Sequence, residues 1–240
     1  MNIAVIFAGG VGKRMRTNGI PKQFLEVYGK PIIIYTLEKF QNDRNIDAIV
    51  VACLKDKIEY CQELVNKFGI TKVKAIVEGG ETGQGSIYNG LKAAKAISES
   101  DDDIVLIHDG VRPLIDEDLI DNNIECVKEN GSAITCVECK ETVVLLDENE
   151  HISDVTNRNS SKIARAPQSF YLKDIWEVHN KAIEDGNTNV IDSCTLMKMY
   201  GKNVSMVMGK SENIKITTPD DYYMFKAILD MKESSNIFGM

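Results

Sequence analysis

Short, continuously apolar segments alternate along this sequence with longer segments of helical periodicity. The segment Ile104–His108 reads IVLIH, and the segments Asn2–Phe7 and Ile46–Cys53 are also rich in aliphatic residues. Such segments are typical of strands in a parallel sheet that helices cover on both faces, because neither face of the strand then meets water. The alternation therefore predicts a doubly wound, mostly parallel α/β sheet. Sheets of this kind bind ligands beyond the carboxyl ends of their strands.

The expected elements follow one another without an internal repeat. Further strands are expected at 73–77, 132–139, 204–208 and 213–217, and helices at 31–41, 57–68, 86–97, 116–129, 172–184 and from 219 onward. Pro31 stands where a helix would begin and Gly69 where one would end, as these residue types commonly do. A chain of 240 residues fits one domain, so we expect residues 1–240 to form a single unit.

The alternation stops between residues 137 and 169. Two strands are expected at Thr142–Leu146 and His151–Val155, joined by a turn at Asp147–Glu150 with no helix between them. A hairpin inserted in a parallel fold commonly projects, and its exposed edge favours pairing with another chain. We therefore predict that residues 137–169 form a projecting β-arm through which the protein forms a homodimer.

Composition and charge exclude several classes of function. The chain has 28 basic and 36 acidic side chains and a net charge of −8, which argues against a nucleic-acid-binding or membrane-surface protein. The apolar segment Ile3–Ala8 is too short for a membrane span or a signal sequence, so a cytoplasmic location is expected. The CxxC pair Cys136 and Cys139 lies in an expected strand, where this spacing places the sulfurs on opposite faces. We interpret the cysteines as reduced thiols without a zinc site.

A cationic, glycine-rich segment follows the first expected strand. No acidic residue occurs before Glu26, whereas this region contains Gly9, Gly10, Gly12, Lys13, Arg14, Arg16 and Lys22. Glycines allow backbone N–H groups to approach a polyphosphate, and basic side chains neutralise its charge. The spacing matches neither GxxxxGK[ST] nor GxGxxG, which argues against a P-loop ATPase or a dinucleotide-binding dehydrogenase. A phosphorylated ligand is expected here, with a solvated basic turn as the alternative.

Five motifs, in this order, resemble those of the cytidylyltransferases that make CDP-ribitol and CDP-methylerythritol. They are Ala8–Met15 with Pro21–Leu25, Gly79–Glu81 with Ser86 and Asn89–Leu91, His108–Pro113, Arg158–Asn159 with Pro167–Phe170, and Asn213–Thr217. The resemblance covers about residues 1–230. It implies a Rossmann-like sheet of the nucleotide-diphospho-sugar transferase type. It also implies transfer of a cytidylyl group from CTP to a small alditol phosphate, with Mg²⁺ as cofactor and pyrophosphate as second product.

The resemblance assigns catalytic roles to several cations. Arg14 and Lys22 are expected to stabilise the charge of the transition state, and Lys215 to steer the acceptor phosphate towards the α-phosphorus. Arg158 is expected to grip that phosphate from the arm of the second subunit, beside Thr142, which would contact the acceptor. The structural alternatives are a sheet-edge charge for Lys215, a salt bridge at the hairpin for Arg158 and a plain strand residue for Thr142.

Other positions are expected to bind the nucleotide. They are Ala8, Gly9, Gly10, Gly12, Gly80, Glu81, Ser86, Asp109 and Gly110. Asp109 follows an expected strand, where its carboxylate can meet ribose hydroxyls or help to hold Mg²⁺; its alternative is to cap the next helix. Ser86 can read the edge of cytosine, and could also serve as a helix cap. Arg112 lies on the substrate side, where we expect it to lock its loop, and His108 is expected to be a buried, hydrogen-bonded neighbour.

The acceptor is open within this resemblance. Gly110 and Val111 separate the Asp and Arg of the HDxxRP motif, where the methylerythritol branch usually has two alanines. A valine there is more similar to the ribitol branch. Ala166 replaces a threonine that both branches usually carry, and Gly83 stands where an arginine is frequent. We expect D-ribitol 5-phosphate, used for teichoic acid or capsule, with 2-C-methyl-D-erythritol 4-phosphate of isoprenoid synthesis as the alternative. A transferase for a sugar 1-phosphate and a non-catalytic nucleotide-binding regulatory protein are the other hypotheses.

Overall fold

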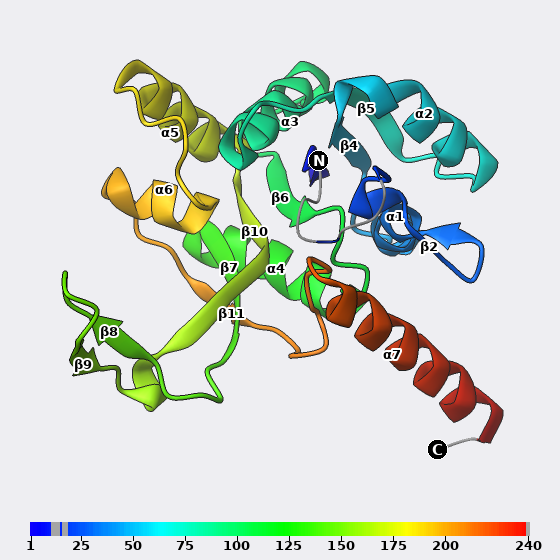
Figure 1. Ribbon diagram of the computed structural model, residues 1–240. Coiled ribbons are helices and arrows are strands. Elements are labelled where there is room, and N and C mark those ends of the chain that lie inside the picture. Colours follow the sequence, from blue (N-terminus) through cyan, green and yellow to red (C-terminus); the bar gives the residue numbers. More distant parts are fainter. Residues whose placement is uncertain (11–14, 16–18, 239–240) are drawn as a thin grey trace.

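The computed structural model describes residues 1–10, 15 and 19–238, with side chains up to residue 234. Within these residues a seven-stranded sheet has the strand order β11-β7-β10-β6-β1-β4-β5 (Figure 1). Its strands are β1 (Asn2–Ala8), β4 (Ala48–Cys53), β5 (Val73–Glu78), β6 (Ile104–Asp109), β7 (Ser132–Glu138), β10 (Lys162–Tyr171) and β11 (Met206–Met208).

The sheet is mostly parallel, which confirms the predicted fold class. β6, β1, β4 and β5 pair in parallel, and β11 is parallel to β7, whereas β10 lies antiparallel between β6 and β7. In the parallel part Ala8 is opposite Cys53, and Phe7 is opposite Asp109. The carboxyl ends of β1, β4 and β6 therefore lie together at one edge of the sheet, where a ligand site is expected.

Helices cover both faces of the sheet, because alternate residues of each central strand point to opposite sides. Ala4 and Ile6 of β1 face a layer formed by α1 (Ile32–Asn42), α2 (Ile58–Lys67) and α4 (Glu117–Asn130). Ile3 and Val5 face a layer formed by α3 (Gly83–Ile97), α5 (Leu172–Glu184) and α6 (Ser193–Met199). Strands with two buried faces account for the continuously apolar segments of the sequence.

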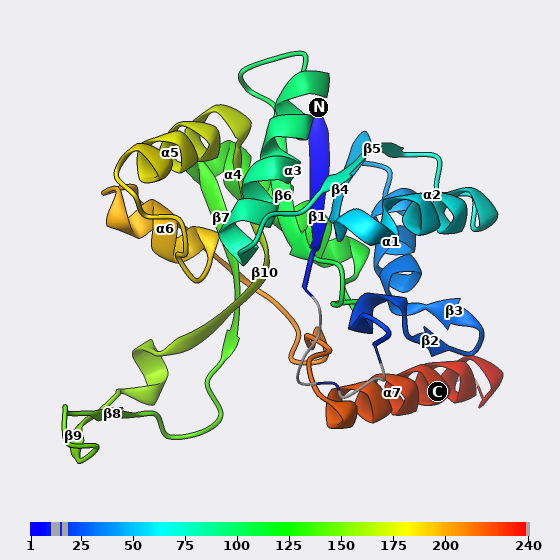
Figure 2. The same ribbon diagram turned by 45° about the horizontal axis from the view of Figure 1, so that its top comes forward.

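The last helix, α7 (Pro219–Phe238), packs outside these two layers. Its buried Phe225 belongs to a third apolar cluster that includes Val27 of β2 (Glu26–Val27) and Ile216. Figure 2 shows α7 beside β2 and β3 (Lys30–Pro31), and the Tyr222 hydroxyl donates to the carbonyl of Glu26 over 2.7 Å. This cluster thereby holds three parts of the chain near one edge of the sheet. They are the parts before and after the undescribed residues 16–18, and the part before α7.

The arm is present and projects from the sheet (Figure 1). Strands β8 (Val144–Leu146) and β9 (Ile152–Val155) form a separate antiparallel pair, shorter than the expected segments. The expected limits of 137 and 169 were too wide, because β7 and β10 continue to pair with each other at Glu138 and Lys162. Only the part between these two residues leaves the main sheet.

Several sequence-based expectations for elements were wrong. Residues 213–217 form no strand, and the N–H of Ile216 donates to the Val111 carbonyl over 2.9 Å. Strand β10 and helix α6 were not expected. Helix α3 begins at Gly83 instead of Ser86, because the side chain of Thr82 accepts a hydrogen bond from the N–H of Gly85 and caps it. Within the described residues, no helix has the length and apolar character needed to cross a bilayer.

Candidate active site

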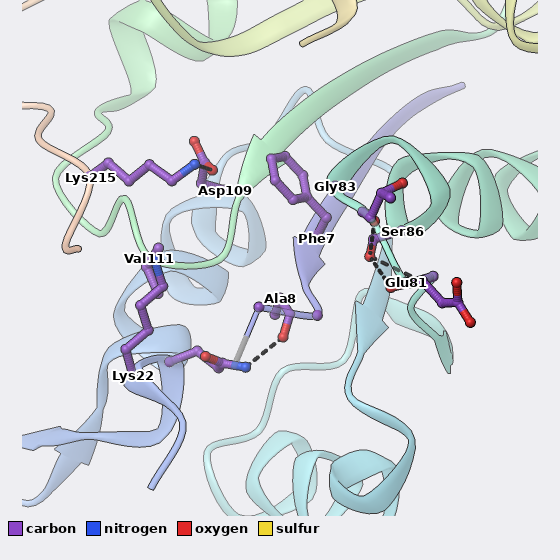
Figure 3. Close-up of a pocket in the computed structure, with 14 residues that line it drawn as sticks. Phe7, Ala8, Lys22, Glu81, Gly83, Ser86, Asp109, Val111 and Lys215 are labelled. Carbon is purple, nitrogen blue, oxygen red and sulfur yellow. Dashed lines mark hydrogen bonds and ion pairs between the residues drawn. The ribbon is translucent and has the colours of Figure 1, made fainter. Parts of the chain in front are cut away.

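A cavity of about 340 Å³ lies at the carboxyl ends of β1 and β6 (Figure 3). Residues from five separate parts of the chain line it. Those that the sequence singled out are Ala8, Gly9, Gly10, Lys22, Gly80, Glu81, Ser86, Asp109 and Lys215. Phe7, Gln23, Thr82, Gly83 and Val111 also line it, although the sequence assigned them no role. Arg14 and Gly12 lie outside the described residues.

Ser86 holds one wall of this cavity together. Its hydroxyl oxygen accepts a hydrogen bond from the N–H of Gly80 over 3.1 Å, and the hydroxyl lies 3.0 Å from the carbonyl of Thr82. Gly80 packs so closely that a Cβ would lie 2.5 Å from the backbone carbon of Gly85, so the loop requires glycine here. Because Thr82 is the cap of α3, the alternative assignment of Ser86 as that cap is wrong. Ser86 instead fixes the backbone edge that the loop presents to the cavity.

Gln23 fixes the end of β1. Its side-chain amide donates to the carbonyl of Ala8 over 2.6 Å, and the side chain is buried. Gln23 belongs to the short helix η2 (Lys22–Phe24), so the same contact holds Lys22 at the edge of the cavity. Gln23 lies within the Pro21–Leu25 motif quoted above, which is the signal that could have identified it.

Asp109 lies between two cations at the end of β6. Its carboxylate contacts Nζ of Lys215 at 2.5 Å and Nε of Arg112 at 2.8 Å. Burial alone would raise the pKa of the Asp109 carboxyl, but the charges of Lys215 and then Arg112 outweigh burial and hold the pKa well below its usual range. The carboxylate is therefore ionised at neutral pH and can act as a hard oxygen ligand.

The neighbouring His108 is hydrogen-bonded to the loop that follows β6. It is fully buried, and Nε2 donates to the carbonyl of Arg112 over 3.1 Å. Burial lowers the pKa of His108 to about 4, and the nearby Asp109 carboxylate offsets this only in part. The ring is therefore neutral at pH 7 and supports the loop, as the sequence predicted.

A loop far along the chain brings Lys215 to the site. Nη1 of Arg112 donates to the carbonyl of Asn213 over 2.9 Å, and Ile216 is hydrogen-bonded to Val111 as described above. Arg112 thus locks two loops together, which agrees with the structural role expected for it. Gly110 does not line the cavity; its N–H donates to the Phe7 carbonyl over 3.0 Å and joins the ends of β6 and β1.

A second cavity, of about 270 Å³, adjoins the first. The two share Phe7, Gly83, Asp109 and Lys215 as lining residues. Arg112, Ala166, Gln168 and Ser193 are among the residues that complete its wall. Asp109 and Lys215 therefore stand at the junction of two adjoining chambers, an arrangement suited to a reaction between two bound molecules.

Arg158 and Thr142 lie together on the arm and away from both cavities. Nη2 of Arg158 donates to the hydroxyl oxygen of Thr142 over 2.9 Å, and both side chains are exposed. Neither lines the cavities of its own chain. The structure thus brings these two expected acceptor-binding residues together, but places them apart from the rest of the expected site.

Comparison with known proteins identifies the family. The profile of the IspD family, described as 2-C-methyl-D-erythritol 4-phosphate cytidylyltransferase, matches residues 2–231. The chain belongs to the IspD family of cytidylyltransferases. The family resemblance read from the motifs is thereby confirmed, and so is the expectation that the chain is a nucleotidyltransferase.

Similar proteins carry two different names within this family. A relative from Streptococcus agalactiae serotype V, named ribitol-5-phosphate cytidylyltransferase, is 59% identical over 240 residues and all of both chains. A relative from Clostridium botulinum (strain Langeland), named 2-C-methyl-D-erythritol 4-phosphate cytidylyltransferase, is 42% identical over 95% of this chain and 97% of its own. A solved structure of 4-diphosphocytidyl-2C-methyl-D-erythritol synthase from Anaerococcus prevotii superposes with a TM-score of 0.83 at 28% identity, covering 96% of each chain.

The donor atoms of the site fit a magnesium ion that arrives with the nucleotide. Within the described residues, no group of three or more His, Cys, Asp or Glu side chains is arranged to hold a metal by itself. The ionised Asp109 could supply one hard oxygen ligand beside the cavity, although its two oxygens also contact Lys215 and Arg112. Mg²⁺ commonly binds through one or two carboxylates together with substrate phosphates and water, so a single carboxylate is sufficient.

Proposed function

We propose that this chain transfers the cytidylyl group of CTP to the phosphate of D-ribitol 5-phosphate and releases pyrophosphate. The observation that carries the proposal is the placing of Lys22, Asp109 and Lys215 around one cavity at the strand ends. The acceptor is supported by the Streptococcus relative, which is identical at more positions than the relative named for 2-C-methyl-D-erythritol 4-phosphate. Val111 of the HDxxRP motif favours the same branch.

The nucleotide would occupy the first cavity. Cytosine would meet the backbone at Ala8 and Gly80, the latter fixed by Ser86, with Glu81 beside it. Backbone N–H groups at Gly9, Gly10 and Gly12 would approach the triphosphate, as glycine-rich segments do. Asp109 would accept hydrogen bonds from the ribose or bind Mg²⁺, which when bound neutralises charge on the triphosphate and the departing pyrophosphate.

The reaction requires two anions to meet. A phosphate oxygen of the acceptor attacks the α-phosphorus of CTP, and the bond from that phosphorus to the oxygen bridging to the β-phosphate breaks as pyrophosphate leaves. Negative charge on the equatorial and departing oxygens increases in the transition state, so positioned cations lower the barrier. We assign this role to Lys22 at the cavity edge and to Arg14.

Lys215 would guide the acceptor phosphate. Its Nζ contacts the Asp109 carboxylate at the junction of the two cavities, and its side chain is 39% exposed. A phosphate entering from the second cavity would therefore meet an ammonium group that Asp109 already holds in place. No proton need be removed, because the attacking phosphate is ionised at neutral pH, which agrees with the buried, neutral state of His108.

Arg158 and Thr142 would complete the site from the arm of a second subunit. The arm exposes large apolar side chains, and solvent-exposed apolar clusters commonly mark an interface. They include Val144, Leu145, Leu146, Ile152 and Val155. Burial of these residues against a second copy would remove them from water. The Arg158 guanidinium, which binds phosphate oxygens in a forked geometry, would then reach the partner's acceptor site.

An acceptor panel tests the proposal. Purified protein with CTP and Mg²⁺ would be given D-ribitol 5-phosphate, 2-C-methyl-D-erythritol 4-phosphate or a sugar 1-phosphate, and pyrophosphate release would be measured. We expect the highest kcat/KM with D-ribitol 5-phosphate, and a much lower value when UTP replaces CTP. A preference for the methylerythritol acceptor would reassign the substrate, and no release with any acceptor would contradict catalysis.

A further inference from the structure

The second cavity adjoins the nucleotide cavity and offers a chamber for the acceptor, and this inference rests on the function proposed above. Its wall is built from β6, β10, the loop that carries Lys215, and the start of α6. The acceptor phosphate must lie at the junction with the first cavity, where Lys215 and Asp109 stand. The carbon chain of the acceptor then has to extend into the second cavity, away from the nucleotide.

The cations on this wall already have partners. Arg112 is paired with Asp109 and bonded to the Asn213 carbonyl, as described above. Nη1 of Arg165 donates to the carbonyls of Ser211 and Asn213 over 2.8 and 3.0 Å. These guanidinium groups give one part of the chamber a positive potential, which favours the phosphate end of the acceptor there.

A second polar group lies where β10 meets α6. The amide of Gln168 donates to Oδ2 of Asp192 over 3.0 Å, and its carbonyl oxygen accepts from the N–H of Cys194 over 2.8 Å. Oδ1 of Asp192 accepts from the N–H of Thr195 and caps α6. The carboxylate of Asp192 repels a phosphate, so it favours the neutral, hydroxyl-bearing end of the acceptor.

Ser193 differs from the other polar residues of this chamber. Its side chain is 2% exposed, and its hydroxyl has no hydrogen-bond partner among the described residues, although the residue lines the cavity. A buried hydroxyl without a partner costs free energy, and a bound ligand that supplies the missing partner would remove that cost. Ser193 can both donate to and accept from a ligand hydroxyl.

We propose that the Ser193 hydroxyl binds a hydroxyl of the acceptor at the end remote from its phosphate, and so selects a polyol of the right length. Ile87, Ile107 and Ala166 also line the chamber and would pack against the carbon chain. A polar group that is left unpaired when the ligand lacks its hydroxyl discriminates more strongly than an apolar wall does. Ser193 is therefore a specificity-determining residue, separate from the cations that stabilise the transition state.

A cycle of enzyme and substrate variants tests this role. Wild-type protein and Ser193→Ala would be compared on D-ribitol 5-phosphate and on 1-deoxyribitol 5-phosphate, which lacks the terminal hydroxyl. In the wild type we expect kcat/KM to fall about tenfold when the hydroxyl is absent. Ser193→Ala should show a similar fall on D-ribitol 5-phosphate and no further fall on the deoxy acceptor, with KM for CTP unchanged.

Thr195→Ala is the matched control, because Thr195 is an exposed residue of the same helix that does not line the chamber. Removal of an unpaired hydroxyl should leave the Tm of Ser193→Ala equal to or above that of the wild type, whereas a purely structural role would lower it. Equal losses on both acceptors, or no loss, would overturn the role of Ser193 and leave the proposed function intact. No product from the wild type with D-ribitol 5-phosphate would overturn both.

Discussion

Lys22 borders the nucleotide cavity from helix η2, where Gln23 anchors it to the end of β1. Lys22→Ala removes a positive charge from the place where the proposed transition state gains negative charge. We expect kcat to fall about 10²–10³-fold, because fixed charges of this kind contribute mainly in the transition state. Pyrophosphate release measures the loss. Lys67→Ala, an exposed lysine on α2 that does not line the cavity, should retain wild-type activity; an equal loss there would contradict the assignment.

Asp109→Asn leaves Arg112 and Lys215 together without their shared counter-charge. Removal of one partner from a buried ion pair costs about 3–5 kcal/mol, and the 39% exposure of the Lys215 side chain favours the lower end of that range. We therefore expect the free energy of unfolding to fall by about 3 kcal/mol at pH 7. Urea denaturation measures this loss, and Glu148→Gln on the exposed arm is the control.

The loss caused by Asp109→Asn should also depend on pH. The native pKa of Asp109 lies below its unfolded value, so its contribution to stability is complete above the unfolded pKa and is lost as the pH falls through the native pKa. The difference between wild type and variant should be constant from pH 7 to about 5 and decrease below about pH 4. A difference that stayed constant to pH 3 would show that the ion pair is not its cause.

Single residues were predictable where their chemistry is carried by a motif. The motifs singled out Ala8, Gly80, Ser86 and Asp109, and all four line one cavity. The buried hydroxyl of Ser193 could not be predicted, because its missing partner is a property of how β10 and α6 meet and leaves no pattern in the local sequence. The sequence shows which side chains can take part in chemistry. A buried polar group without a hydrogen-bond partner can be recognised only in the packed structure.

At the scale of elements, the approach of α3 to β1 makes a sharp prediction. A Cβ at Gly90 would lie 2.5 Å from Cγ1 of Val5, which is fully buried and branched at Cβ. Gly90→Ala should therefore lower the free energy of unfolding by about 1–3 kcal/mol, even though alanine favours a helix. Gly83→Ala is the matched control on the same helix, since a Cβ there meets nothing within 4 Å.

A double variant separates this overlap from other effects of alanine at position 90. Val5→Ala removes the methyl group that a Cβ at Gly90 would meet, so the loss in Val5→Ala/Gly90→Ala should be smaller than the sum of the two single losses. Thermal or urea denaturation measures the stabilities of the wild type, the two single variants and the double variant. Additive losses would mean that the overlap with Val5 is not the cause of the loss in Gly90→Ala.

Elements were predictable where local pattern and final pairing agree. β1, β4 and β6 are short apolar segments and became central strands, whereas β10 was missed. Pro167 interrupts β10, cannot donate to a neighbouring strand, and lies where the pairing with β7 shifts register. Residues 213–217 show the opposite error, because a strand was predicted there and none is present. Ile214 and Ile216 alternate as in a strand, but the segment pairs with no neighbouring strand.

At the scale of the whole molecule, the expected site residues fall into two separate groups. Arg158 and Thr142 lie on the arm, while Lys22 and Lys215 line cavities at the sheet edge. The arm also exposes Leu146 and Ile152, which are 56% and 64% exposed. Both facts are explained together if the arm of one subunit completes the site of the other. Two-fold symmetry would then give two composite sites per dimer.

Mixing two inactive variants tests composite sites directly. In Lys22→Ala the sheet-edge half of the site is defective, and in Arg158→Ala the arm half is defective. A mixed dimer would have one site with both defects and one intact site, formed by the sheet edge of Arg158→Ala and the arm of Lys22→Ala. After random reassortment about half of the dimers are mixed, and each mixed dimer has one intact site of its two. We therefore expect about a quarter of wild-type activity to be restored.

The control for this experiment pairs two defects in the same half of the site. Lys22→Ala mixed with Lys215→Ala should show no restoration if both residues act within one subunit, because every site then contains at least one defect. Reassortment itself is checked by sedimentation of differently tagged chains. If Lys22→Ala and Arg158→Ala form mixed dimers without regaining activity, Arg158 acts within its own subunit or not at all. The apolar arm would then serve assembly alone.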